Sequence, residues 1–295
     1  MTLHSSVADR LLAAGIEPAD TERAVRSALD EDLRYGPDIT SAATASPGAQ
    51  TVADVVAREP GVVAGLPVAL AVLDAAGVPS GGAEPLCADG DRVQADTAVL
   101  RICGPLRQLL GAERTLLNFL THLSGIATAT RAWADAVAGT SAVVRDTRKT
   151  TPGLRQLEKY AVRCGGGMNH RMGLGDAALV KDNHVAAAGG IEAAIRAVRA
   201  AAPHLPLEVE CDTLEQVREA LAAGAELILL DNMGIPDLRA AVTLARRYPT
   251  VRLEASGGLR LETARAVAET GVRFLAVGAL THSSPALDLG LDLPP

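Results

Sequence analysis

Lysine is scarce in this chain of 295 residues, although basic residues as a group are not. Of the 28 lysine and arginine residues only three are lysines, namely Lys149, Lys159 and Lys181. Arginine therefore supplies almost all of the general positive charge. A lysine ammonium is a compact, mobile point charge, whereas an arginine guanidinium is a planar fork. Three lysines within 33 residues thus indicate either specific chemistry or the chance clustering of a rare residue.

Aromatic residues and an excess of positive charge are also lacking. The chain contains one Trp, three Tyr and two Phe, and its formal net charge is −7 at pH 7. A nucleic-acid surface needs a basic face and usually aromatic side chains on which bases stack. The composition therefore argues against a nucleic-acid partner. The segment from residue 145 to residue 171 departs from this average, because it holds seven basic residues against two acidic ones.

Signals for membranes and export are missing as well. No apolar run approaches the roughly 18 residues that a membrane-spanning helix needs. The first 20 residues lack a basic stretch followed by an apolar one, the pattern of a secretion signal. These features predict a cytoplasmic protein without a membrane partner, whose cysteines are reduced. The four cysteines are too far apart for a typical metal-site pairing, and they are Cys87, Cys103, Cys164 and Cys211.

A regular repeat of short apolar runs and helical patterns begins near residue 141. Buried strands that alternate with helices predict a parallel sheet. The even repeat, without a dinucleotide-binding motif, favours an α/β barrel over a doubly wound sheet. The segment 212–215 has the spacing of a capping box for one of the helices. Six strands are expected, at residues 141–145, 177–180, 207–209, 227–230, 251–253 and 273–277.

The part of the chain before this repeat has a different pattern. A helical region that ends at residue 33, strands at 51–58 and 98–102, and a helix at 65–76 predict a separate α/β lobe. Pro105 then begins a long helix that leads into the barrel. Its apolar stripe consists of Leu116, Leu120, Leu123 and Ala127.

Charged residues follow the predicted barrel strands at the ends where such barrels carry their chemistry. Cations follow the first two strands and acids follow the next three. The segments Ser256-Gly257-Gly258 and Gly278-Ala279 add small residues whose backbone N–H groups can approach an anion closely. The combination indicates a site for a phosphorylated polyanion with sugar hydroxyls or a metal ion. The charged residues are Lys149 and Lys181, then Glu210, Asp231 and Glu254.

Each of these features also has a plainer structural explanation. Asp231-Asn232 could cap the next helix, and Glu210 and Glu254 could form ion pairs inside the barrel. Glycine pairs such as Gly257-Gly258 often only make turns, and His170-Arg171 could be a solvated loop pair. The arrival of charged groups at successive strand ends favours the functional interpretation.

Longer motifs identify a family. The sequence reads DTRKTTPGLR at residues 146–155, EKYAV at 158–162 and GGGMNHR at 165–171. Together with shorter motifs they resemble the quinolinate phosphoribosyltransferase family, also called carboxylating nicotinate-nucleotide pyrophosphorylases, over nearly the whole chain. The shorter motifs lie at residues 31–33, 36–40, 113–118, 174–176, 180–184, 208–210, 230–233 and 254–258.

The resemblance implies a two-part α/β fold and a dimer. An N-terminal α/β sandwich lobe is expected at residues 1–117, and residues 283–295 are expected to return to it. An incomplete parallel α/β barrel of about seven strands is expected at residues 118–282. The lobe of one subunit in a homodimer is expected to cover the barrel mouth of the other.

The resemblance also implies an activity in NAD biosynthesis. Phosphoribosyl pyrophosphate and quinolinate would give nicotinate mononucleotide, pyrophosphate and CO2. Catalysis would involve Lys149, Lys181, Glu210 and Asp231, and the two acids would organise Mg²⁺ through water. Lys159 matches the family motif without an assigned role. Substrates would be bound by Arg114 from across the dimer interface, and by Thr147, Arg148, Lys149, His170, Arg171, Lys181, Glu210, Asp231, Ser256, Gly257, Gly258 and Gly278.

Two other functions stay open at this point. One is a related phosphoribosyltransferase of the same superfamily, either a homologue associated with molybdenum transport or an enzyme that uses nicotinate. The other is a barrel without enzymatic activity that binds a phosphorylated metabolite. Paired acids and cations in one site favour an enzyme over such a binding protein.

Overall fold

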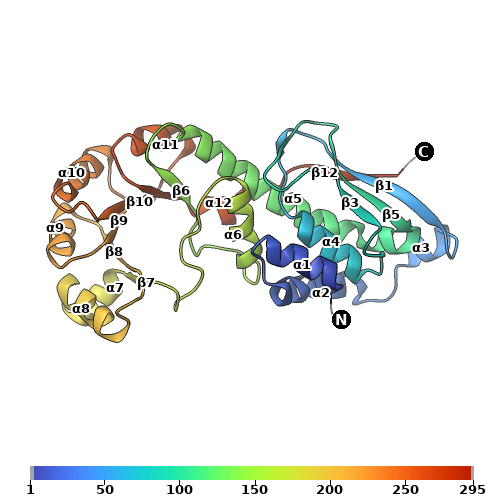
Figure 1. Ribbon diagram of the computed structural model, residues 1–295, viewed down its shortest axis with the longest axis horizontal. Helices are drawn as coiled ribbons and strands as arrows, with labels where there is room; N and C mark the ends of the chain where they lie inside the picture. Colours follow the sequence, from blue (N-terminus) through green and yellow to red (C-terminus); the bar gives the residue numbers. More distant parts are fainter. Residues whose placement is uncertain (1–2, 294–295) are drawn as a thin grey trace. The chain divides into compact units, whose positions relative to one another are not determined.

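The computed structural model describes residues 3–293, which form two compact units (Figure 1). Unit 1 comprises Met1–Arg131, Thr150–Gly166 and Leu280–Pro295, and unit 2 comprises Ala132–Lys149 and Gly167–Ala279. Residues 1, 2, 294 and 295, which the predicted ranges include, lie outside the described residues.

The division between the units differs from the one expected after residue 117. That boundary falls inside the uninterrupted helix α5 (Leu106–Ala136). Residues 150–166, which were expected in the barrel, group with unit 1. One reason is a hydrogen bond of 2.9 Å between the ring Nε2 of His122 on α5 and Oε1 of Glu158. Glu158 lies on α6 (Arg155–Cys164) and is fully buried.

Unit 1 contains helices whose starts follow from local capping. Asp38 accepts the backbone N–H of Ser41 over 3.0 Å and so caps the third helix. The carboxylate of Asp89 accepts the N–H groups of Gly65 and Leu66 at the start of the fourth. The helix predicted at residues 65–76 is thereby confirmed. The helices before α5 are α1 (Ser5–Ala13), α2 (Pro18–Leu33), α3 (Ile39–Thr44) and α4 (Leu66–Ala75).

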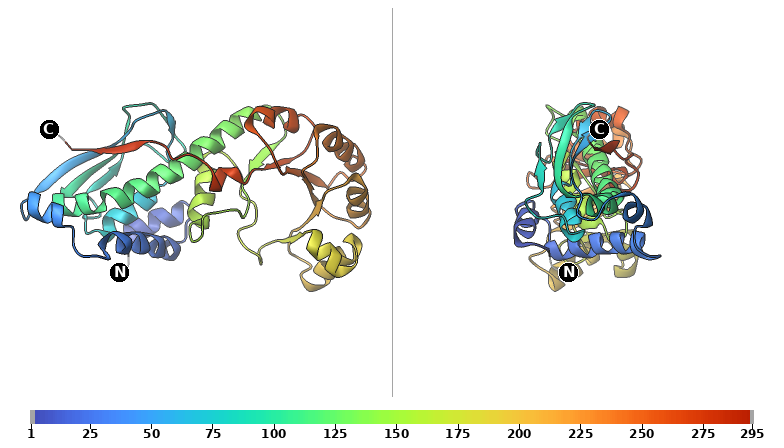
Figure 2. Two further views of the ribbon diagram at one scale, coloured as in Figure 1. Left: turned by 180° about the vertical axis from the view of Figure 1, so that it is seen from behind. Right: turned by 90° about the vertical axis from the view of Figure 1, so that its right-hand side faces the viewer.

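An antiparallel sheet completes unit 1, in the order β12-β1-β5-β3. The strands predicted at residues 51–58 and 98–102 are its two central strands. At one edge the C-terminal strand pairs with β1, so that Asp292 lies opposite Asp54 (Figure 2). The strands are β1 (Gln50–Ala57), β3 (Ala83–Pro85), β5 (Ala98–Pro105) and β12 (Leu289–Asp292), with β2 (Gly61–Val62) and β4 (Arg92–Val93) as a separate pair.

Helix α5 is the long helix predicted from its apolar stripe. Leu116, Leu120, Leu123 and Ala127 are all buried, as expected for the face of an amphipathic helix that contacts the core. Across residues 3–293 no helix combines the length and the apolar character needed to cross a lipid bilayer.

Unit 2 is built on a six-stranded parallel sheet in the order β6-β11-β10-β9-β8-β7. All six predicted strands are confirmed. Helices α8 to α11 follow the outer side of the curved sheet (Figure 1). The strands are β6 (Val143–Arg145), β7 (Ala178–Val180), β8 (Leu207–Cys211), β9 (Leu227–Asp231), β10 (Arg252–Ser256) and β11 (Phe274–Ala276). The helices are α7 (Asp182–Ala188), α8 (Ile191–Ala201), α9 (Leu214–Ala222), α10 (Ile235–Ala245) and α11 (Leu261–Ala268). Helix α12 (Ala279–His282) begins at the last residue of unit 2 and continues in unit 1.

The sheet is an open barrel, because β6 and β7 are its two edges. A single parallel bridge between Arg145 and Met168 extends the edge at β6. Met168 donates its N–H to the carbonyl of Val144 over 2.8 Å and accepts the N–H of Asp146 over 3.2 Å. Six strands and this one-residue bridge correspond to the expectation of an incomplete barrel of about seven strands.

The capping box of α9 lies one residue later than predicted. The Oγ1 atom of Thr213 accepts the N–H of Gln216 over 3.2 Å. In return, Oε1 of Gln216 accepts the N–H of Thr213 over 3.1 Å. The reciprocal pair is therefore Thr213 with Gln216 rather than Asp212 with Glu215. Asp212 does not form the predicted pair with Glu215, because the N–H of Asp212 donates to Oε1 of Gln216 over 2.7 Å.

Candidate functional site

A cavity of about 340 Å³ lies at the carboxyl ends of the strands of unit 2. Side chains of a strand alternate between the two faces of a sheet, so every second residue shares a face. The lining residues from the strands follow this alternation, and all of them belong to unit 2. They are Leu179, Glu210, Leu229, Asp231, Glu254, Ser256 and Ala276, and loop residues complete the wall.

Most of the predicted site residues converge on this cavity. Arg114 does not line it, because it lies in unit 1 as an exposed residue of α5. Gly257 and Gly258 directly follow a lining residue, and Gly278 follows β11, but none of the three lines the cavity. The predicted residues that line it are Thr147, Arg148, Lys149, His170, Arg171, Lys181, Glu210, Asp231 and Ser256.

Lys181 and Glu210 form an ion pair at the cavity wall, with 2.6 Å between Nζ and Oε2. The ion-pair explanation proposed for Glu210 is thus confirmed. The side chain of Lys181 is 45% exposed, so solvent screens the pair and it contributes little to stability. The backbone N–H of Lys181 donates to Nδ1 of His184 over 3.0 Å, which fixes the chain where α7 begins. The ammonium group therefore stays accessible to an anion.

The loops after β9 and β10 interlock at the cavity rim. Asn232 has a φ of 54° and donates its side-chain N–H to Oδ2 of Asp231 over 2.7 Å. Its backbone N–H donates to the carbonyl of Ser256 over 2.9 Å. Gly257 has a φ of 83°, and a Cβ atom there would lie 2.3 Å from Oδ1 of Asn232. This close approach explains why glycine follows Ser256, and the residue makes a tight turn, as its plainer explanation expected.

The helix-cap explanation for Asp231-Asn232 is wrong. Helix α10 begins after Gly234, and no side chain in the described residues 3–293 caps its first turn. Asn232 instead holds the neighbouring loop and the carboxylate of Asp231. A left-handed backbone at a residue other than glycine stores strain, and such strain gathers at functional sites. The arrangement thus favours a functional position for Asp231.

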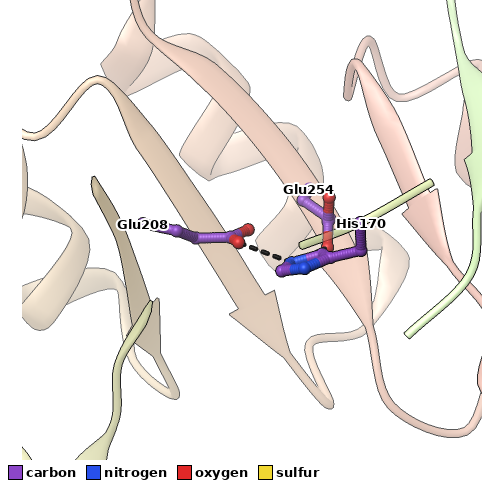
Figure 3. A group of neighbouring side chains, drawn as sticks. All are labelled: His170, Glu208 and Glu254. Atoms are coloured by element: carbon purple, nitrogen blue, oxygen red, sulfur yellow. Dashed lines mark hydrogen bonds and ion pairs between the residues drawn. The ribbon is translucent and has the colours of Figure 1, made fainter. Parts of the chain in front are cut away.

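His170 is buried, lines the cavity and contacts protein groups through both ring nitrogens. Figure 3 shows its contact with Glu208. The backbone N–H of Arg171 donates to Nδ1 over 2.8 Å, so Nδ1 carries no proton. The ring proton therefore lies on Nε2, which donates to Oε2 of Glu208 over 2.6 Å. The backbone N–H of His170 donates to buried Asp146 over 2.8 Å. The solvated-loop explanation for His170-Arg171 is therefore wrong.

Glu254 forms the ion pair that its plainer explanation expected. Its Oε2 accepts from Nη1 of Arg145 over 2.6 Å, and the guanidinium of Arg145 lies over the ring of Phe274, 4.6 Å from the ring centre. Burial, and then the nearby charge of Glu208, raise the pKa of Glu254 to about 7, and the charge of Arg145 opposes this rise. Its Oε1 is buried and has no hydrogen-bond partner within residues 3–293.

The atoms of His170, Glu208 and Glu254 lie within 4.8 Å of one another, a spacing that could hold a metal ion. The hydrogen bonds argue otherwise, because Nε2 of His170 carries the proton that it donates to Glu208. A metal ligand would have to give up that proton. We therefore describe the group as a buried cluster of hydrogen-bonded charges.

The sequence placed Glu254 among the acids at the strand ends, with an ion pair as the plainer explanation, and it indicated no role for Arg145 or Glu208. A signal for Glu208 was present in the sequence. It precedes Glu210 by two residues on β8, so both side chains face the same side of the sheet. No comparable signal identifies Arg145, because its partner lies on a strand 109 residues away.

Arg148 and Arg171 give the cavity unsatisfied hydrogen-bond donors. The Nε atom of each is buried and has no partner in the described part of the chain. Arg171 also donates from Nη1 to the carbonyl of Ala177 over 3.0 Å. Burial, and then the like charge of Arg148, lower the pKa of Arg171. Two neighbouring guanidinium groups that repel each other in a cavity favour an anionic ligand with planar carboxylates.

Two domain models of one protein family match most of the chain. The model of the N-terminal domain of quinolinate phosphoribosyl transferase matches residues 38–124, and that of the C-terminal domain matches residues 126–292. The chain is 58% identical over 271 residues to a carboxylating nicotinate-nucleotide pyrophosphorylase of Mycobacterium leprae, covering 91% of this chain and 95% of that protein. It is 39% identical over 304 residues to the chloroplastic Arabidopsis thaliana protein of the same name, covering 96% and 86%.

A solved structure is similar as well. The nicotinate-nucleotide pyrophosphorylase of Francisella tularensis superposes with a TM-score of 0.88 at 38% identity, covering 94% of this chain and 96% of that one.

Proposed function

Because the chain belongs to the quinolinate phosphoribosyltransferase family, we propose that it joins phosphoribosyl pyrophosphate to quinolinate with loss of CO2. The products are nicotinate mononucleotide, pyrophosphate and CO2, a step of NAD biosynthesis. One observation carries the proposal. A single cavity of unit 2 brings together four cationic and three acidic side chains, and these are Arg148, Lys149, Arg171, Lys181, Glu210, Asp231 and Glu254.

The cations suit two substrates that repel each other. Quinolinate carries two adjacent carboxylates, and the unsatisfied guanidinium groups of Arg148 and Arg171 can bind planar carboxylates through paired N–H donors. Lys149 and Lys181 are mobile point charges that can follow pyrophosphate as it departs. Both ring nitrogens of His170 form hydrogen bonds with protein groups. We therefore assign His170 the role of positioning the backbone of Arg171 beside the substrate.

The reaction needs little proton transfer at its first step. The ring nitrogen of quinolinate attacks the anomeric carbon while pyrophosphate leaves, and the sugar develops positive charge. Glu210 and Asp231 bind the ribose hydroxyls and stabilise that charge. The alkylated nitrogen is positive and draws electrons from the bond between the ring and the adjacent carboxylate. That bond then breaks, and CO2 leaves.

The same two carboxylates fit a magnesium ion. Each uses one oxygen in a pair, Glu210 with Lys181 and Asp231 with Asn232. Their remaining oxygens make no hydrogen bond in the described residues, and oxygen donors are what Mg²⁺ prefers. Glu210 and Asp231 would hold the hydrated ion through water molecules. When bound, Mg²⁺ neutralises charge on the departing pyrophosphate.

The remaining predicted residues complete the proposed site. Ser256, Gly257, Gly258 and Gly278 form the cradle for the 5′-phosphate, a role that the left-handed backbone of Gly257 and Gly258 supports. Arg114 reaches the substrate from the second subunit of a homodimer. Arg114 is exposed on α5 and is not among the residues that line the cavity, which is compatible with that contribution. Four free cysteines support a reducing compartment such as the cytoplasm.

A release assay with two substrates tests the proposal. Purified protein with phosphoribosyl pyrophosphate and Mg²⁺ is supplied with quinolinate or with nicotinate, and pyrophosphate and CO2 are measured. Release of both products in equal amounts with quinolinate, and of neither with nicotinate, supports the proposal. Pyrophosphate release with nicotinate would instead favour the nicotinate-using relative. Binding of phosphoribosyl pyrophosphate without any product would favour a binding protein.

A further inference from the structure

The proposed reaction leaves one proton without a donor. When CO2 departs, the electron pair of the broken bond remains on the ring carbon next to the alkylated nitrogen. That carbon must gain a proton before nicotinate mononucleotide is complete. We infer that Glu254 is the catalytic acid that donates this proton from Oε1, an inference that rests on the proposed function.

The position of Glu254 suits this role. It lies on β10, lines the cavity and is fully buried. Arg145 holds Oε2 over 2.6 Å, which orients the carboxyl group. The other oxygen, Oε1, has no hydrogen-bond partner within residues 3–293. It lies 3.6 Å from Nε2 of His170, which is beyond hydrogen-bond distance. A carboxyl fixed at one oxygen can present its other oxygen to a substrate.

The charges around Glu254 favour its protonated form. Arg145 from β6 contributes one positive charge, and Glu208 from β8 contributes a second carboxylate. His170 is neutral, because Nδ1 accepts an N–H and only Nε2 carries a proton. The residues paired with Glu254 on β9 and β11 are Leu229 and Phe274, which carry no charge. Two buried carboxylates with one cation become neutral when one of them keeps a proton.

The choice between the two acids follows from the cavity. Both are buried and each has an oxygen without a hydrogen-bond partner in residues 3–293. Glu254 lines the cavity, whereas Glu208 does not. The raised pKa of Glu254 adds support, since its carboxyl keeps a large protonated fraction near neutral pH. Glu208 is held by His170 and serves to keep that ring in place.

The proton transfer balances without another reactant. The bond from the ring carbon to the carboxylate breaks, and CO2 leaves without the bonding electrons. As the bond breaks, those electrons form the new C–H bond with the proton of Oε1, so the rate of CO2 release depends on this proton transfer. Glu254 becomes a carboxylate and is protonated again from water before the next turnover. No oxidant, reductant or further cofactor takes part.

A single-turnover experiment measures the two products separately. The enzyme with Mg²⁺ is mixed with phosphoribosyl pyrophosphate and labelled quinolinate, and pyrophosphate and CO2 are followed over time. In Glu254→Gln we expect the rate of CO2 release to fall about 100-fold more than that of pyrophosphate release, the usual contribution of a general acid. The nucleotide that still carries both carboxylates should accumulate. Glu208→Gln is the matched control and should slow both products equally.

The pH dependence gives a second measurement on the wild-type enzyme. CO2 release should slow as the pH rises through about 7, where Glu254 loses its proton, while pyrophosphate release should not follow the same curve. The inference is overturned if Glu254→Gln slows both products equally, or leaves both as in wild type. Should that variant not fold, identical pH curves for the two products in wild type overturn it. A wild-type enzyme that releases neither product refutes the proposed function instead.

Discussion

The Nε2 atom of His170 donates a hydrogen bond of 2.6 Å to Oε2 of Glu208. Because Nδ1 of the same ring accepts the N–H of Arg171, the imidazole joins a cavity-lining loop to a buried acid of the sheet. Through these two hydrogen bonds the loop from Met168 to Arg171 is fixed to buried Glu208. The same bonds position the backbone of Arg171, from which its guanidinium extends.

Replacing His170 with alanine should destabilise the protein. The change leaves the carboxylate of Glu208 buried without a donor, and losing a hydrogen bond to a charged group costs about 2–3 kcal/mol. Urea unfolding should detect the loss, with the exposed His204→Ala as the control, which should change stability by less than about 0.5 kcal/mol. Equal stability of the two variants would contradict the buried hydrogen bond.

The two cavity lysines should each be needed for turnover. Lys149→Ala and Lys181→Ala should each lower kcat/KM for pyrophosphate release by about 100- to 1,000-fold, comparable to the loss of a transition-state donor. Arg196→Ala removes a cation that is 70% exposed outside the cavity and should leave turnover near wild type. Near-normal activity of either lysine variant would argue against this cavity as the reaction site.

Secondary-structure elements and the ends of strands could be predicted from the sequence. Side-chain pairs between residues far apart in the chain could not. Every strand of unit 2 was predicted, because buried parallel strands read as short apolar runs. Nine of the thirteen predicted site residues line one cavity, since strand ends meet at one edge of the sheet. The role of Arg145 depends on its pairing with Glu254 across the fold, and periodicity carries no information about such a pair.

The boundary between the two units could not be predicted from local sequence patterns either. Helix α5 runs without interruption through the expected boundary, so no break in composition marks a change of unit. Residues 150–166 group with unit 1 through contacts such as that of Glu158 with His122, 36 residues earlier in the chain.

Replacing Gly257 with alanine should damage the cavity rim. A Cβ atom would lie 2.3 Å from Oδ1 of Asn232, and the φ of 83° is unfavourable for alanine. Stability should fall by more than about 1 kcal/mol in urea unfolding, and the KM for phosphoribosyl pyrophosphate should rise. Gly81→Ala, where a Cβ meets no atom within 4 Å, should do neither. An unchanged KM in Gly257→Ala would rule out a role of this loop in phosphate binding.

The stability of the folded protein should depend on the protonation of Glu254. Its folded pKa of about 7 lies above the unfolded value, so the folded state binds more protons between these two values. The contribution is therefore fully present below the unfolded pKa and is lost as the pH rises through about 7. Urea unfolding at a series of pH values should show a loss on the order of 3 kcal/mol from this group. Glu254→Gln should lack this component, and an identical pH slope in both proteins would contradict it.

Mixing two inactive variants tests whether Arg114 acts across a dimer interface. Arg114→Ala and Lys181→Ala remove groups that the proposal assigns to different subunits of the same site. After subunit exchange, half of the dimers are hybrids, and each hybrid regains one intact site of its two. Activity should therefore recover to about a quarter of the wild-type value. The recovery requires that the dimers exchange subunits. A mixture of Lys149→Ala with Lys181→Ala is the control and should stay inactive, because both lysines belong to the same subunit's cavity. If the Arg114 mixture also stays inactive although exchange is demonstrated, each site is built from one chain.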